Sequence, residues 1–290
     1  MPHAEPALVL FPGALGDAVC LEPAVAHLAE SMAVTLYARG GAAEVAALYP
    51  SPVAVRSLDA VEIARLFAPS DDPRTREWLE GFARIVSFTG AGVPVVERRL
   101  GATGRGSVSR FPRPPLGEHA ADVFLRAVGA DPGRTRSVPH LTAPDAPARG
   151  DAPRLLALLP GSGGHHKRIP REIHEALAAR WSAASGEVVV VLGPAEPGED
   201  EAWRAIGAVA RPDSVGRLAA VLAGATAFVG NDAGPSHVAA ALRTPGVVVY
   251  ATTGPGDFGP RGPDVSAITL DQGTAAAIES AWRALRPRLP

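Results

Sequence analysis

The sequence predicts an α/β protein made of two doubly wound halves, and three observations support this prediction. Short apolar runs alternate with Ala- and Leu-rich amphipathic stretches, which is the pattern of βα units around parallel sheets. The alternation occurs twice, on either side of the aperiodic stretch LTAPDAPARGDAP at residues 141–153. The 290 residues suffice for two domains. We expect domains at residues 1–145 and 146–290, with ligands at the carboxyl ends of the strands in a cleft between them.

In the first half, short apolar runs predict the strands, and apolar residues at helical spacing predict the helices. The expected strands cover residues 7–11, 33–37, 53–55, 84–88 and 106–109. The expected helices cover residues 16–31, 42–48 and 117–128.

The second half repeats the alternation more regularly. The expected strands cover residues 155–159, 188–192, 225–229 and 247–250. The expected helices cover residues 171–185, 200–206, 215–222, 235–242 and 274–285. The last helix is expected in the second domain, and packing against the first domain is the alternative.

Composition limits the partners. The chain is 47% hydrophobic and 20% charged with a net charge of -2, which gives no case for nucleic acid. The single cysteine, Cys20, excludes an intrachain disulfide and fits a reducing compartment. No apolar stretch reaches the roughly 18 residues of a membrane span, and the N-terminus reads as a strand rather than a signal peptide. We expect a cytoplasmic protein, with peripheral contact at the inner membrane face left open.

The turn after the first strand, PGALGD, contains Gly13 and Gly16 but lacks the G-x-G-x-x-G pattern of dinucleotide-binding loops. Asp17 falls in the first turn of the following helix. It is either a favourable charge on the helix dipole or a general base that faces the cleft.

A second turn, PGSGGHHKR at residues 160–168, can wrap backbone N–H groups around an anion. It is not a P-loop, because Lys167 is not followed by Ser or Thr. Lys167 is the only lysine beside 27 arginines, which suggests that a compact ammonium is needed there. The histidine pair 165–166 lacks further ligands nearby, and no Asp-x-Asp stands at a strand end, so we expect no metal.

Two further turns follow apolar strands. Glu196, in the turn GPAE, is either an exposed loop residue or an acceptor for ribose hydroxyls. The stretch GNDAGPSH at residues 230–237 places Pro235 at a helix start, where free N–H groups of Ser236 and His237 would make an anion site. A well-capped βα turn is the plainer alternative.

Together these turns resemble glycosyltransferase family 9, the ADP-heptose:lipopolysaccharide heptosyltransferase family. The matching segments are ALGD (14–17), PGS with KRIP (160–162 and 167–170), GPAE (193–196) and, most distinctively, GNDAGPSHVAAALRTP (230–245). The chain has Ile169 where the family usually has Trp, and Ala233 where Ser or Thr is usual.

The resemblance implies a GT-B fold, with two Rossmann-like domains, and an inverting, metal-independent glycosyl transfer without a cofactor. It implies that Asp17 is the base, that Lys167 binds donor phosphate, and that Glu196 binds the nucleoside. The implied donor-binding residues are Gly13, Gly16, Ser162, Gly163, Lys167, Glu196, Asp232, Ala233, Gly234, Ser236 and His237. The co-substrate would be a nucleotide sugar, in the first place an ADP-linked one.

The acceptor would be a glycan or a glycolipid. Arg105, Arg110 and Arg113 are candidates for contacts with its phosphates, and a solvated arginine-rich surface is the alternative. Two other functions stay open: a catalytically idle protein that binds nucleotide sugars, and another GT-B enzyme such as a sugar-nucleotide epimerase.

Overall fold

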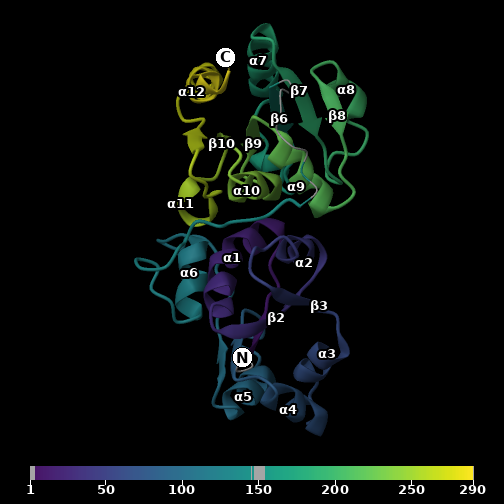
Figure 1. Cartoon of the computed structure of the whole chain (residues 1–290), viewed down its shortest axis with the longest axis vertical. Coiled ribbons are helices and arrows are strands. Elements are labelled where there is room, and N and C mark those ends of the chain that lie inside the picture. Colours follow the sequence, from purple (N-terminus) through teal and green to yellow (C-terminus); the bar gives the residue numbers. More distant parts are fainter. Residues whose placement is uncertain (1–3, 145, 147–153, 290) are drawn as a thin grey trace. The chain divides into compact units, whose positions relative to one another are not determined.

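The computed structural model describes residues 4–144, 146 and 154–289. It divides into two compact units, Met1–Ser137 and Val138–Pro290. Most of the expected linker, residues 145 and 147–153, lies outside the described residues. Each unit contains one parallel sheet with helices around it (Figure 1).

The first unit contains a five-stranded sheet in the order β3-β2-β1-β4-β5. Its strands are β1 (Glu5–Leu10), β2 (Met32–Ala38), β3 (Val53–Ser57), β4 (Arg84–Ser87) and β5 (Gly106–Val108). Its helices are α1 (Leu15–Ala29), α2 (Gly40–Ala46), α3 (Val61–Phe67), α4 (Pro73–Glu80), α5 (Pro94–Ala102) and α6 (Ala120–Ala127). The expected helix at 117–128 starts later, because His119 is the N-cap and its Nδ1 accepts the Ala121 N–H at 3.1 Å.

The second unit contains a six-stranded sheet in the order β11-β10-β9-β6-β7-β8. Its strands are β6 (Leu155–Leu159), β7 (Glu187–Val191), β8 (Ala208–Ala210), β9 (Ala227–Asn231), β10 (Gly246–Tyr250) and β11 (Val265–Thr269). Its helices are η1 (His165–Lys167), α7 (Arg171–Ala183), α8 (Asp200–Arg204), α9 (Val215–Gly224), α10 (Gly234–Ala241), α11 (Pro255–Phe258), α12 (Thr274–Leu285) and η2 (Arg286–Arg288).

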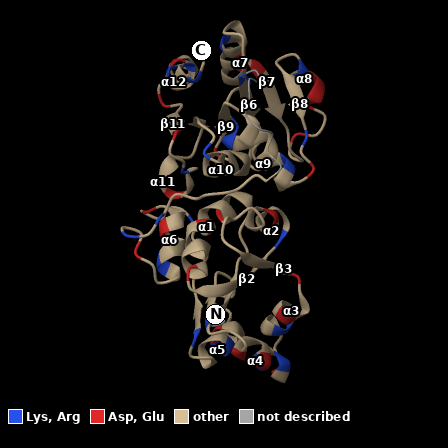
Figure 2. Cartoon of the chain, viewed as in Figure 1, with Lys and Arg blue, Asp and Glu red and all other residues tan. Residues whose placement is uncertain are grey.

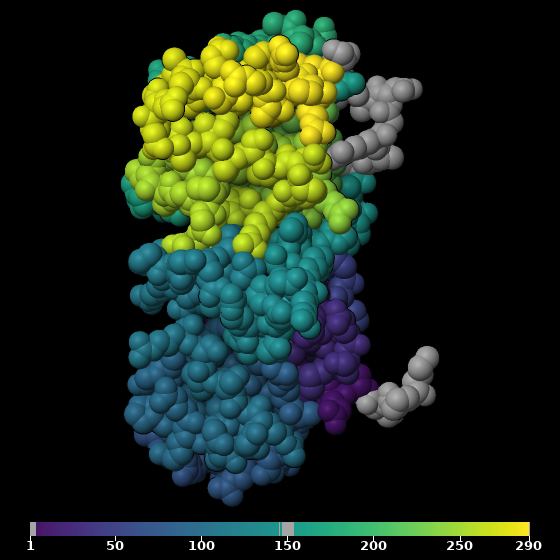
Figure 3. Space-filling model, turned by 90° about the vertical axis from the view of Figure 1, so that its left-hand side faces the viewer, coloured from purple at the N-terminus to yellow at the C-terminus, as the bar shows by residue number. Residues whose placement is uncertain are grey.

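The central strands of the second unit are buried along nearly their whole length. LLALL in β6, GVVVY in β10 and AFVG in β9 are continuous apolar runs, as expected for parallel strands covered on both faces, and β9 ends in the polar Asn231. Helix α12 packs against α7, β10 and β11 of the same unit. In the space-filling view the C-terminal residues, in yellow, cover one end of this unit (Figure 3).

Charged residues of both signs are interspersed along the chain in each unit (Figure 2). No helix in the described ranges combines the length and the apolar character that a membrane span requires.

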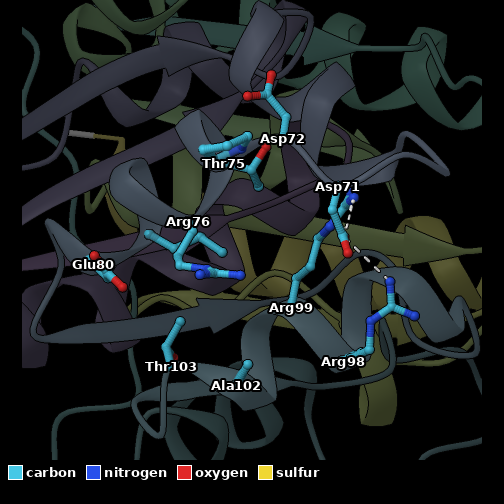
Figure 4. A pocket seen from close by; sticks show the side chains of 11 residues that line it. Asp71, Asp72, Thr75, Arg76, Glu80, Arg98, Arg99, Ala102 and Thr103 are labelled. Carbon is cyan, nitrogen blue, oxygen red and sulfur yellow. Dashed lines mark hydrogen bonds and ion pairs between the residues drawn. The ribbon is translucent and has the colours of Figure 1, made fainter.

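A cavity of about 420 Å³ lies in the first unit, lined by residues of α4, α5 and the loop before α4 (Figure 4). The side chain of Arg99 is 8% exposed and donates to the carbonyls of Arg65 and Leu66 at the end of α3. It also donates to Asp71 at 3.1 Å, and this bond together with the charge of Arg98 lowers the pKa of Asp71. Asp72 pairs with Arg65 at 3.3 Å. Both Asp71 and Asp72 thus form ion pairs with arginines.

A buried histidine lies in the core of the second unit. His174 of α7 is 1% exposed, and its ring packs edge-on against Trp203 with 5.7 Å between the centroids. Neither ring nitrogen has a hydrogen-bond partner among the described residues. Burial alone lowers the pKa of His174 from 6.5 to about 4, because the core cannot solvate an imidazolium.

We therefore expect His174 to make the protein acid-sensitive. Its folded pKa lies below its unfolded pKa, so only the unfolded state takes up this proton between about pH 6.5 and pH 4. Stability is full above this window and falls as the pH drops, by on the order of 2 kcal/mol at pH 4.5. Urea unfolding of the wild type and of His174→Leu at pH 7.5 and 4.5 measures the difference. The leucine variant should lose less stability on acidification, and equal losses would contradict the assignment.

Candidate functional site

The second sheet changes its winding direction between β6 and β9. From β6 the chain proceeds to β7 and β8 on one side, and then returns to β9, β10 and β11 on the other. The two turns that follow these neighbouring strands are therefore forced apart by their helices, and ligands of open α/β sheets bind at such a switch point. The turn after β6 contains Lys167, and the turn after β9 contains Asp232.

Asn231 joins these two turns. It is fully buried, and its Nδ2 donates to the carbonyls of Pro160 at 2.6 Å and Gly161 at 3.2 Å. Its Oδ1 accepts the Ile169 N–H at 3.1 Å. Asn231 still pairs with β10 as the last residue of β9, which is why this strand extends past the expected end at residue 229. The amide thereby fixes both ends of the turn that contains Lys167.

Lys167 and Asp232 form an ion pair across the switch point. The distance from Nζ to Oδ2 is 2.9 Å, and the two side chains are 33% and 8% exposed. Thr253, in the loop after β10, donates its hydroxyl to the same Oδ2 at 2.8 Å. Burial first, and the charge of Asp232 second, raise the pKa of the neighbouring Tyr250. Thr253 is not among the residues predicted from the sequence, although the TTGP turn that follows an apolar strand is a signal for it.

The glycine-rich turn before Lys167 contains an internal hydrogen bond. Ser162 is buried, and its Oγ accepts the Gly164 N–H at 3.4 Å. The chain then forms the 3₁₀ turn η1, and Thr252 donates its hydroxyl to the carbonyl of His166 at 3.1 Å. Gly163 has no atom near the position of an added side chain, so it faces open space. This turn therefore presents Lys167 at its end.

The start of α10 differs from the expectation in one respect. The N–H groups of Ser236 and His237 are not free, because both point to the carbonyl of Ala233, at 3.0 and 3.4 Å. The hydroxyl of Ser236 is also used, since it donates to the carbonyl of Asn231 at 2.7 Å. Ala233 is the N-cap and Gly234 is the first helical residue. The amides that precede Pro235 are thus the ones suited to an anion at this helix start.

Glu196 is 2% exposed and makes internal bonds with both oxygens. Oε1 accepts from Arg168 at 2.8 Å, and Oε2 accepts the Gly193 N–H at 2.9 Å. Gly161 is required beside it, because an added Cβ would lie 2.6 Å from Oε2. In this structure Glu196 holds two turns together.

Asp17 lies at the carboxyl edge of the first sheet, in the first turn of α1. It is partly exposed, and its Oδ2 accepts the Ala14 N–H at 2.8 Å, which caps the helix. Gly13 allows this packing, since an added Cβ would lie 2.8 Å from the Cβ of Asp17 and closer still to the ring of Phe11. Gly16 lies inside α1. Asp17 is thus a helix cap whose carboxylate lies at a strand-end turn, and its role as a general base stays a prediction.

The three candidate acceptor arginines do not form one group. Arg105 precedes β5, whereas Arg110 and Arg113 follow it, so they lie at opposite edges of the sheet. Arg110 and Arg113 are exposed and flank Phe111, whose ring packs against Phe11 with 5.7 Å between the centroids. Phe11 starts the turn that contains Asp17. Two of the arginines therefore lie at the same sheet edge as Asp17, and Arg105 does not.

Within the described residues, no group of three or more His, Cys, Asp or Glu side chains is placed to hold a metal ion.

Comparisons with known proteins agree on the fold. A glycosyltransferase family 9 protein from Veillonella parvula matches with a TM-score of 0.74 and 16% identity, over 99% of this chain and 97% of that one. The E. coli heptosyltransferase WaaC with ADP matches with a TM-score of 0.72 and 19% identity, over 96% and 99%. The iron-containing dodecameric glycosyltransferase TibC of enterotoxigenic E. coli matches with a TM-score of 0.54 and 14% identity, over 85% and 58%. No curated protein matches the sequence.

The GT-B prediction is confirmed by the similarity of the two parallel-sheet units to the heptosyltransferase structures. The family model of glycosyltransferase family 9 (heptosyltransferase) matches residues 123–283, which is more than half of the chain. This match includes all the strand-end turns of the second unit. The protein belongs to glycosyltransferase family 9.

Proposed function

We propose that the chain is an inverting glycosyltransferase that moves a heptose-like sugar from a nucleotide-activated donor, in the first place an ADP-linked one, to a hydroxyl of a glycan or lipid-linked acceptor. The observation that carries the proposal is the ion pair of Lys167 and Asp232 at the switch point of the second sheet, beside the start of α10. An ammonium and helix amides suit a diphosphate. Family membership and the ADP in the WaaC structure support this choice of donor.

In the proposed reaction, the oxygen of the acceptor hydroxyl attacks the anomeric carbon while Asp17 takes its proton. The bond from this carbon to the diphosphate breaks, and the nucleoside diphosphate leaves with the electron pair. Lys167 and the amides at the start of α10 stabilise the negative charge that grows on the leaving group. Attack from the face opposite the leaving group inverts the anomeric centre.

The acceptor would bind on the first unit. Arg110 and Arg113 lie at the sheet edge of Asp17 and suit an anionic acceptor, because a guanidinium binds phosphate and carboxylate in a two-pronged geometry. Arg105 is left out of the proposed site, since it lies at the other edge. An acceptor on a lipid would bring this unit to the membrane surface at the cytoplasmic face.

Lys167→Ala should weaken ADP binding by about 10- to 100-fold, because a charge-assisted hydrogen bond to phosphate is lost. Isothermal titration of ADP against the wild type and the variant measures this change. Arg180→Ala is the matched control, since it removes a positive charge whose partner, Glu279, lies outside the turns. Equal ADP affinity in the wild type and Lys167→Ala would remove Lys167 from the donor site.

Transfer should proceed in EDTA, because we propose that Lys167 and the helix amides neutralise the diphosphate without a metal. TibC has a related fold and is iron-containing, so a related fold alone does not decide the outcome of this test. The rate is measured with and without chelator, and again after magnesium, manganese or iron is added back. A rate that falls in EDTA and returns with one of these metals would refute metal independence.

Asp17→Asn should retain ADP binding and lose about 10²- to 10⁴-fold in turnover, the usual contribution of a positioned base. The amide oxygen of asparagine can still accept the Ala14 N–H, so the helix cap and the fold should persist. Turnover with the true acceptor and the melting temperature are measured together. A nearly normal rate would leave Asp17 as a helix cap only and would favour an alternative function.

A further inference from the structure

The two threonines after β10 donate hydrogen bonds to the turn that contains Lys167 and to Asp232, the ion-pair partner of Lys167. Thr252 donates to the carbonyl of His166, and Thr253 donates to Asp232 Oδ2. Strand β10 pairs with β9, so the end of β10 lies beside Asp232 because of the sheet register. The register brings the end of β10 beside Asp232, and the hydrogen bonds of Thr252 and Thr253 then hold the following loop in place.

Asp232 Oδ2 has two donors in this structure, Lys167 Nζ at 2.9 Å and Thr253 Oγ1 at 2.8 Å. The carboxylate is 8% exposed, so water solvates it poorly. A buried carboxylate that is left without any charged or polar partner is strongly disfavoured. If Lys167 turns to a bound diphosphate, Asp232 loses its charged partner, and Thr253 is the donor that remains.

We propose that Thr253 is a positioning residue that keeps Asp232 hydrogen-bonded while Lys167 turns from Asp232 to the donor diphosphate. This inference rests on the proposed function of the site. Thr253 touches neither the donor nor the acceptor and acts through Asp232. Its hydroxyl lowers the free-energy cost of releasing the lysine, so its effect on affinity requires that Lys167 be present.

The test is a double-mutant cycle on ADP affinity, measured by isothermal titration without any acceptor. Thr253→Val should raise the Kd for ADP about tenfold, since it removes a hydrogen bond to a charged group. Thr253→Ser retains the hydroxyl and should bind like the wild type. Thr269→Val is the matched control, because Thr269 makes the same kind of bond, to Asp271 at 2.7 Å, at the end of the neighbouring strand β11. Its Kd should not change.

In the Lys167→Ala background, Thr253→Val should leave the Kd within about twofold, because no lysine is left to release. An equal effect of Thr253→Val with and without Lys167 would overturn the inference, as would wild-type affinity in Thr253→Val. Melting temperatures show whether each variant is folded, and Thr253→Ala replaces the valine variant if that one is not. If Lys167→Ala itself leaves ADP affinity unchanged, the proposed donor site fails as well, so the two failures are distinguishable.

Discussion

The side chain of Asn231 is the contact on which the geometry of the second unit's site depends. A parallel sheet places the carboxyl ends of β6 and β9 side by side but leaves the turns beyond them free. One buried amide removes that freedom, because it binds the carbonyls at the start of the β6 turn and the N–H of Ile169 at its end. Lys167 then lies where it meets Asp232, the next residue after Asn231.

The same principle operates around Asp17 with apolar contacts in place of hydrogen bonds. Gly13 lets the turn after β1 fold over Phe11, and Phe11 packs against Phe88, Phe111 and Phe124. The ring of Phe111 brings the loop after β5 to this cluster, together with the exposed arginines on either side of it. An aromatic cluster in the core thus positions a polar sheet edge.

Sequence patterns identified the five strands of the first sheet and the four buried strands of the second, and did not identify β8 and β11. LLALL, EVVVV and GVVVY are strong patterns, and all three are central or near-central strands. The helices α3 to α5 were missed, since they are short and PRTREWLE of α4 is mostly polar. The strand β8 has three residues, and β11 is an edge strand of mixed polarity. Such elements form because neighbouring elements pack on them, which local pattern does not record.

The sequence by itself determined that the βα pattern occurs twice, which family the chain resembles, and which turns contain the polar residues. These features follow from hydrophobic period and from residue type, which are local. Only the tertiary structure decided which partner each polar group has. It paired Asp232 with both Lys167 and Thr253, used the amides of Ser236 and His237 within α10, buried Glu196 against Arg168, and separated Arg105 from Arg110. The reason is physical: a hydrogen bond tolerates a change of only a few tenths of an ångström in the donor–acceptor distance. Here the donor and acceptor often lie in segments far apart in the chain, which the tertiary structure brings together.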